Sequence, residues 1–74
     1  MYKENLKYLR TNVRFLRKQH GYSLQEFADI LGMSKASISS FESGYSGISL
    51  EPLIKIKTLF KVSIDDLLFK DMTK

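Results

Sequence analysis

The sequence predicts an all-α domain of five helices, and three observations support this fold class. Apolar residues recur at intervals of three and four along most of the chain, which is the spacing of one helical face. A serine precedes four of these stretches, as helix N-caps do, at Ser23, Ser34, Ser49 and Ser63. No stretch alternates apolar and polar residues for long, as a half-buried strand would. We therefore expect residues 1–74 to form a single compact helical domain.

The first helix is expected to span roughly Glu4 to Gln19 and to end at His20 and Gly21. Its buried stripe consists of Leu6, Leu9, Val13 and Leu16. Basic side chains follow a different face of the same helix, namely Lys3, Lys7, Arg10, Arg14 and Lys18.

The segment 23–44 is predicted to form two short helices joined by a tight turn. Ser23 and Glu26 have the spacing of a capping box, and Gly32 ends the first of these helices. The apolar face of that helix consists of Leu24, Phe27, Ala28 and Leu31. In the second helix Ile38 and Phe41 point inward, which leaves outside Lys35, Ala36, Ser39 and Ser40. Two helices joined this closely form a helix-turn-helix, whose second helix enters the major groove of DNA.

Two further helices are expected after a loop at residues 44–47. Ser49 caps the fourth, and Pro52 is tolerated because the first turn of a helix has amides without helical partners. Its core face is predicted to be Leu50, Leu53, Ile56, Leu59 and Phe60. Ser63 caps a short fifth helix, whose apolar residues are Ile64, Leu67, Leu68 and Phe69.

Composition excludes several classes of function. The chain has 74 residues, a formal net charge of +4 and no cysteine, so disulfides and thiolate metal sites are ruled out. Its single histidine has no second ligand nearby, and no nucleophile–base pair is apparent, so we expect no metal, no cofactor and no enzyme. The early charged residues leave no room for a signal peptide, and no apolar run could cross a membrane; we expect a cytoplasmic protein.

Positive charge is concentrated in the first helix. Residues 1–20 contain six Lys and Arg against one Glu, whereas residues 21–54 contain only Lys35 against four acids, Glu26, Asp29, Glu42 and Glu51. The segment predicted to read DNA is therefore mildly acidic, and most of the positive field comes from the first helix.

The run VRFLRKQHGYSLQEFADILGMSKASISSFESG, followed by SLEPLIKIKTLFKVSIDDLL, resembles the Cro/repressor-type (XRE-like) helix-turn-helix family. The resemblance implies a lambda-repressor-like five-helix domain that binds double-stranded DNA. It places residues that touch base edges at Lys35, Ala36, Ser39 and Ser40. It places phosphate contacts, including backbone amides near residues 45 and 46, at Ser23, Gln25, Ser34, Ser43, Tyr45 and Ser46. It also implies a buried structural ion pair between Arg17 and Glu42.

Three departures from the family pattern imply fewer phosphate contacts per chain. Relatives usually have Gln where this chain has Leu24, so Gln25 or the helix N-terminus would have to substitute. The loop after the recognition helix, Tyr45-Ser46-Gly47, lacks the Lys or Arg that relatives often carry there. Lys57 and Lys61 replace a small residue and a Gly, so the end of the fourth helix is expected to differ. The basic face of the first helix is expected to be an ordinary solvated face rather than a stripe along the groove. At most one or two of its cations would touch phosphate, with Arg10 and Arg14 the best candidates.

Surplus apolar residues in the segment 62–72 suggest a homodimer interface. Its candidate residues are Ile64, Leu68, Phe69 and Met72. Tyr8 and Phe15 share another face of the first helix, which either a terminal tail or a partner would cover.

The sequence thus predicts a bacterial or phage-encoded transcriptional regulator, most simply a repressor that binds an inverted repeat as a homodimer. No small-molecule ligand is indicated. The alternative is a protein-interaction module on the same fold, such as an antitoxin or an anti-repressor-like partner. Salt dependence separates the two, because only DNA binding weakens steeply as counterions compete for phosphate.

Overall fold

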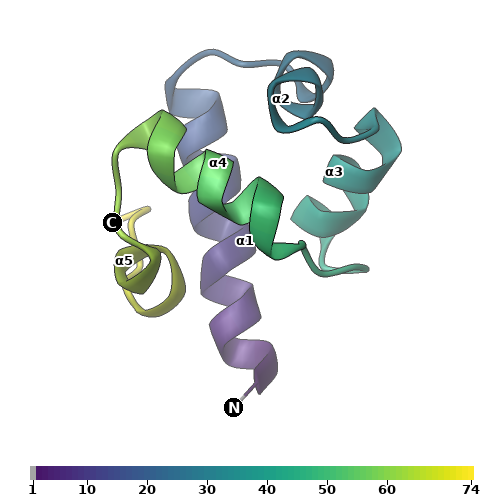
Figure 1. Ribbon diagram of the computed structural model, residues 1–74. Coiled ribbons are helices and arrows are strands. Elements are labelled where there is room, and N and C mark those ends of the chain that lie inside the picture. The colour runs from purple at the N-terminus through teal and green to yellow at the C-terminus, as the bar shows by residue number, and fades with distance from the viewer. Residues whose placement is uncertain (1) are drawn as a thin grey trace.

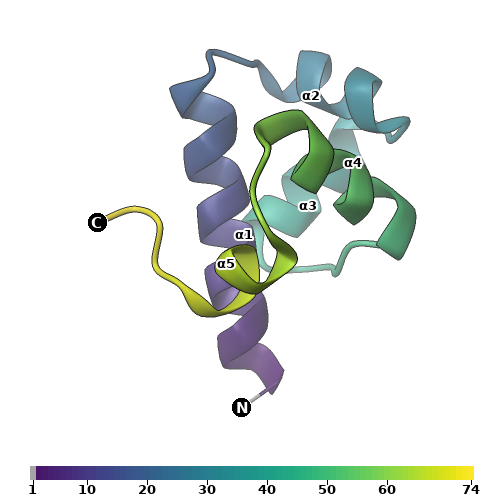
Figure 2. The same cartoon turned by 60° about the vertical axis from the view of Figure 1, so that its left-hand side comes forward.

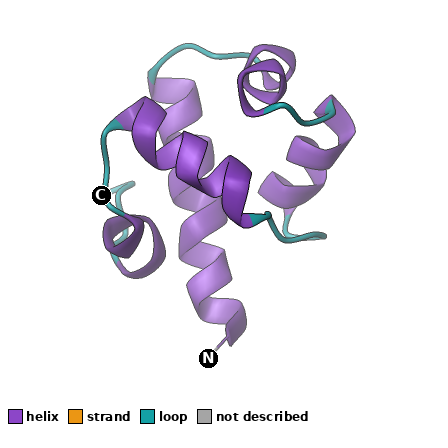
Figure 3. Ribbon diagram, viewed as in Figure 1, coloured by secondary structure: helices purple, strands orange, loops and turns teal. Residues whose placement is uncertain are grey.

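The computed structural model describes the backbone of residues 2–74 and the side chains of residues 8–74. The chain forms five helices: α1 (Tyr2–Gln19), α2 (Leu24–Leu31), α3 (Lys35–Ser43), α4 (Leu50–Phe60) and α5 (Ile64–Phe69) (Figure 1). Within this described part all regular structure is helical (Figure 3), which confirms the predicted fold class. Helix α1 begins two residues before the predicted Glu4. The side chains predicted for its first turns, Lys3, Leu6 and Lys7, lie outside the described residues.

Local sequence sets the helix boundaries of the helix-turn-helix. The Ser23 hydroxyl accepts a hydrogen bond from the amide of Glu26, whose side chain accepts one from the Ser23 amide, completing the predicted capping box. Ser34 caps α3 in the same way through the amide of Ser37. Gly32 and Gly44 end the two helices with φ of 71° and 88°, the left-handed region in which a side chain would be strained.

The other two caps differ in detail from one another. The Ser63 hydroxyl accepts a hydrogen bond from the amide of Asp66, whereas Ser49 stands at the N-cap of α4 without a side-chain hydrogen bond. Lys61 ends α4 with φ 56°, the left-handed conformation that a glycine adopts at this position without strain. The lysine thus takes up the left-handed turn at the end of α4 itself.

The long helix α1 is the axis of the domain. It packs against α5 and α3, while α2 packs against α3 and α4 (Figures 1 and 2). The buried core draws on all five helices and consists of Leu9, Val13, Leu16, Phe27, Ala28, Leu31, Ile38, Phe41, Ile56, Phe60 and Leu67. The helix-turn-helix is thus fixed to α1 through one continuous apolar core.

One predicted core residue of α4 is wrong. Ile56 and Phe60 are buried and set the direction of the core, whereas Leu50 is 71% exposed. A helix advances about 100° per residue, so Leu50 lies about 100° around the axis from the mean direction of those two residues. Leu53 and Leu59 are half-buried against the core.

Asn12 closes the fold at the C-terminal end, a role that was not predicted from the sequence. Its side chain is fully buried in the middle of α1. The Asn12 Nδ2 donates to the carbonyls of Leu67 at 2.9 Å and Lys70 at 2.6 Å, and Oδ1 accepts from the Met72 amide at 2.9 Å. One polar side chain therefore ties the segment after α5 to α1.

Candidate nucleic-acid interface

Helix α3 presents a small, polar outer face. Ile38, Phe41 and Glu42 are its buried residues, and helical geometry places opposite them Ala36, Ser40 and Ser43. Ala36 and Ser43 are exposed, while Ser39 and Ser40 are half-buried. Such short side chains allow the helix to approach another surface closely.

Lys35 and Ser37 complete the exposed side chains of the first turn of α3. Ser37, which the sequence interpretation missed, is exposed beside Lys35, and its hydroxyl lies 2.9 Å from that of the Ser34 cap. The signal available in the sequence was a polar side chain three residues after the Ser34 cap, in the first turn of the helix.

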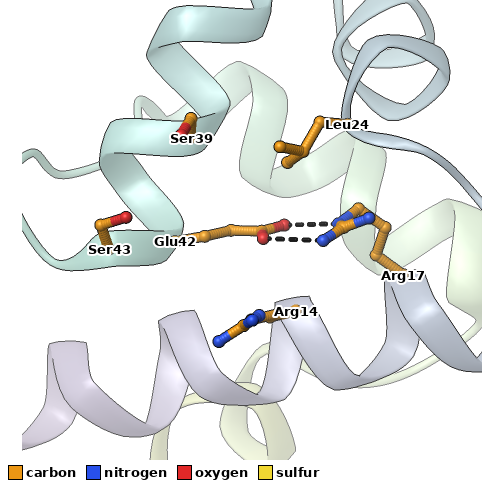
Figure 4. Close-up of a pocket in the computed structure, with 6 residues that line it drawn as sticks. All are labelled: Arg14, Arg17, Leu24, Ser39, Glu42 and Ser43. Carbon is orange, nitrogen blue, oxygen red and sulfur yellow. Dashed lines mark hydrogen bonds and ion pairs between the residues drawn. The ribbon is translucent and has the colours of Figure 1, made fainter.

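A buried ion pair holds α3 against α1. Arg17 Nε lies 2.7 Å from Glu42 Oε2, and Arg17 Nη2 donates to Glu42 Oε1 at 3.1 Å (Figure 4). Arg17 Nη1 donates to the Tyr22 carbonyl at 2.8 Å, so the same guanidinium also fixes the connection to α2. This geometry is bidentate, which gives both strength and a defined orientation.

The ion pair corrects the charge balance inferred from the sequence. Glu42 was counted as an acid of the reading segment, yet it is buried and neutralised by Arg17. Along α3, all of which the structure describes, the one exposed charge is that of Lys35. The outer face of this helix is therefore neutral to basic, not acidic.

The start of α2 is internally bonded. The Ser23 amide donates to Glu26 Oε1 at 2.8 Å. This backbone hydrogen bond, and after it one from the Ser23 side chain, lowers the pKa of the Glu26 carboxyl. Gln25 Nε2 donates to Asp29 Oδ1 at 2.9 Å, so the amide expected to replace the family Gln is turned along its own helix.

The loop after α3 corrects another expectation. The amides of Tyr45 and Ser46 both donate to the Ser40 carbonyl, at 2.9 Å and 3.4 Å, which leaves them unsuited as phosphate donors. The two residues are exposed, Tyr45 to 89%, so any contact from this loop belongs to their hydroxyl groups.

An open depression of about 220 Å³ lies between α1, α3 and the start of α2. Its lining residues are Arg14, Arg17, Leu24, Ser39, Glu42 and Ser43 (Figure 4). The Arg17–Glu42 pair spans the depression, while Arg14 reaches toward it from the next turn of α1. The leucine at the family Gln position is thus on the wall of this depression.

Arginines of α1 follow the C-terminal half of α3. Arg17 meets Glu42, Arg14 shares the depression with Ser43, and Arg10 lies over the helix end at Gly44. A Cβ placed on Gly44 would lie 3.0 Å from Arg10 Nε, so that glycine allows the arginine to approach the backbone.

The proposed dimer residues are only partly available. Leu68 and Met72 pack against the core of their own chain, as does Phe15. The apolar surface left for a partner is therefore smaller than the sequence suggested. Phe69 is 61% exposed, Ile64 is half-buried and Tyr8 is 39% exposed. Phe69 is therefore the main apolar side chain that the C-terminal helix leaves uncovered.

Two classes of site find no support among the described residues. No group of three His, Cys, Asp or Glu side chains comes together there to hold a metal ion. None of the described helices combines the length and apolarity needed to cross a membrane.

Comparisons with known proteins identify the family. The Helix-turn-helix family model matches residues 13–67. The chain is 42% identical over 59 residues to the HTH-type transcriptional regulator AnsR of Bacillus subtilis (strain 168), which covers 80% of this chain and 51% of that protein. It is 40% identical over 60 residues to the antitoxin PezA of Streptococcus pneumoniae, covering 81% and 38% of the two chains.

A third relative is the competence pilus inhibition repressor of Acinetobacter baylyi, 38% identical over 55 residues, covering 74% of this chain and 50% of that protein. The chain thus spans about half, or less, of the length of these curated relatives. No solved structure matches at a comparable level of significance. The matched region covers the helix-turn-helix and the helices that support it, and several of the relatives are named as transcriptional regulators. The chain therefore belongs to the helix-turn-helix family of DNA-binding transcriptional regulators.

Proposed function

We propose that the chain binds double-stranded DNA in a sequence-specific manner and acts as a transcriptional repressor, pairing as a homodimer on an inverted repeat. The observation that carries the proposal is the outer face of α3, which is short-chained, polar and free of exposed acid. A helix with that face can approach base edges in the major groove closely.

The base contacts are assigned to Lys35, Ala36, Ser39 and Ser40. Lys35 donates to guanine O6 or N7, the Ala36 methyl suits a thymine methyl, and a serine hydroxyl serves donor or acceptor bases. Ser40 lies on the outward side of α3, whereas Ser39 lies at its edge on the depression. Ser40 is therefore the better candidate of the two for a base contact.

Phosphate contacts are assigned to side-chain hydroxyl groups around this helix, and to the Gln25 side-chain amide where it exchanges Asp29 for phosphate. Those of Ser43, Tyr45 and Ser46 lie at its C-terminal end, while Ser23, Gln25 and Ser34 lie at the starts of α2 and α3. These contacts fix the register of the protein on the duplex without reading its sequence.

Dimer formation would increase the number of DNA contacts beyond those that one chain can make. A single chain makes few charged phosphate contacts, whereas two recognition helices about 34 Å apart would read both halves of a palindrome. The exposed Phe69, together with Ile64, Leu68 and Met72, is the proposed contact between the copies. Repression is favoured because one relative carries that name.

A second candidate function is a protein-interaction role on the same fold. It is favoured by the similarity to a protein named as an antitoxin. The exposed apolar side chains Leu50 and Ile54 on α4 would suit such a contact.

The first experiment is the selection of bound duplexes from a random pool at near-physiological salt. Enrichment of an inverted repeat with half-sites about one helical turn apart is expected for a homodimeric reader. The matched control is Ala36→Glu, which places an acid on the outer face of α3 and should abolish enrichment with the fold intact. Recovery of nothing above background by the unaltered chain would reject the proposal in favour of the protein-interaction role.

A further inference from the structure

The depression between α1, α3 and the start of α2 is lined by charged and hydroxyl side chains. We propose that it binds one internucleotide phosphate of the DNA backbone, with Arg14 as the cation that holds it. The inference rests on the proposed DNA-binding function and adds a site to it. It assigns a phosphate contact to α1, outside the helix-turn-helix.

The place of the depression follows from groove geometry. The major groove is about 12 Å wide, and an α-helix with its side chains is about 10–12 Å across, so a helix in the groove has phosphates along its flanks. Two residues of α3 line the depression: Ser43, which is exposed, and Ser39, which is half-buried at the edge of the outer face. When the outer face of α3 meets the bases, the depression therefore faces one flanking sugar–phosphate backbone.

Charge selects an anion for this site. The depression is lined by three charged side chains, of which Arg17 and Glu42 neutralise each other at 2.7 Å. That leaves the positive charge of Arg14, an exposed side chain with no ion-pair partner among residues 8–74. The guanidinium is planar and matches phosphate oxygens in a bidentate manner, so it is the suitable cation for this ligand.

The remaining lining explains why the site depends on Arg14. Ser39 and Ser43 add hydroxyl donors from α3, whereas Leu24 adds an apolar wall and no donor. The amide of Gln25, the neighbouring alternative, is bonded to Asp29. Among the lining side chains Arg14 is thus the one that carries an uncompensated charge.

The test uses the duplex recovered by selection and a set of duplexes in which one phosphate at a time is made a neutral methylphosphonate. For the unaltered chain, one neutral phosphate beside each half-site should weaken binding about tenfold. Binding by Arg14→Met should not weaken further when that phosphate is made neutral, because the arginine that would contact it has already been removed. The slope of log K against log salt should fall in magnitude by about 0.9 per protomer in Arg14→Met.

Matched variants distinguish the loss of this phosphate site from the loss of one positive charge elsewhere on the protein. Lys57→Met removes another exposed cation, one on α4, and should keep both the salt slope and the phosphate profile of the unaltered chain. Arg14→Lys keeps the charge and should retain most of the slope. Leu24→Gln in the Arg14→Met background places an amide donor on the wall and should recover part of the lost affinity.

The outcomes are distinct. If the unaltered chain selects a duplex but Arg14→Met keeps the same salt slope and methylphosphonate profile, the phosphate site is overturned while the proposed function stands. If the unaltered chain binds no DNA, both are rejected. Melting curves serve as the fold check, and Arg14→Met should match the unaltered chain because Arg14 is exposed.

Discussion

The contact between Arg17 and Glu42 is the residue-scale feature on which the position of the reading helix depends. Both side chains are less than 10% exposed. Glu42→Ala would leave the Arg17 charge buried without its partner, which costs about 3–5 kcal/mol. In a domain of this size we expect the melting temperature to fall by more than about 10 °C in circular-dichroism unfolding.

The control for that variant is Glu51→Ala, which removes an exposed acid from the first turn of α4. Its melting temperature should stay close to that of the unaltered chain, because such a charge contributes at most about 1 kcal/mol. A Glu42→Ala melting curve equal to the control would show that the pair contributes nothing to stability.

Lys35 is the residue-scale test of base reading. It is exposed in the first turn of α3 and carries the one exposed charge of that helix, all of which the structure describes. Lys35→Ala should weaken binding to the selected duplex by about 1–3 kcal/mol and relax the preference at one base pair. Titrations against the selected duplex and its single-base variants measure both effects. An unchanged affinity would remove Lys35 from the reading residues.

At the scale of elements, the segment after α5 is held to α1 by Asn12. Asn12→Asp keeps the shape of the side chain but replaces the Nδ2 donor with an oxygen facing the Leu67 and Lys70 carbonyls. Each buried group left unpaired costs about 1–3 kcal/mol. We expect faster hydrogen exchange at the Met72 amide and through α5, with less change at α2 and α3.

Thr58→Ala is the matched control for this variant. It removes a hydrogen bond to the Ile54 carbonyl at an exposed position of α4, where water replaces the lost partner. Exchange in α5 should then stay as in the unaltered chain. Equal protection of Met72 in Asn12→Asp and Thr58→Ala would mean that the C-terminal segment is held by apolar packing alone.

At the scale of the whole molecule, the proposed homodimer depends on which apolar surface is left uncovered. Phe69→Asp is a sharper test than a change at Leu68, because Leu68 also packs against its own core. We expect Phe69→Asp to sediment as a monomer with a normal melting curve. Its control, Ile54→Asp, changes another exposed apolar residue on α4 and should sediment as the unaltered chain does. The opposite pattern would place the interface on α4.

Local signals explain how much of this fold was predictable. Ser23, Ser34 and the two helix-ending glycines act within a few residues, so the boundaries of α2 and α3 follow from the sequence. Leu50 was misplaced because apolar spacing defines a stripe but not the angle at which the core meets it. Asn12 was missed because its partners stand more than 50 residues later in the chain.

The candidate interface divides in the same way. The resemblance pointed to the residues of α3 and to the Arg17–Glu42 pair, since these depend on positions within a fixed motif. The bonds of the Tyr45 and Ser46 amides to Ser40, and of Gln25 to Asp29, depend on loop path and rotamer. Neither is encoded in residue type, so the donors left for phosphate could only be sorted out in three dimensions.

The anchoring of Met72 to Asn12 has a practical consequence for labelling. The C-terminus lies across α1 from α3 in both views (Figures 1 and 2). A fluorophore or fusion partner joined at Lys74 would therefore leave the molecule on the side away from the helix-turn-helix. A dye at that end can report the tumbling of the complex in an anisotropy titration while the surface that meets the duplex stays clear.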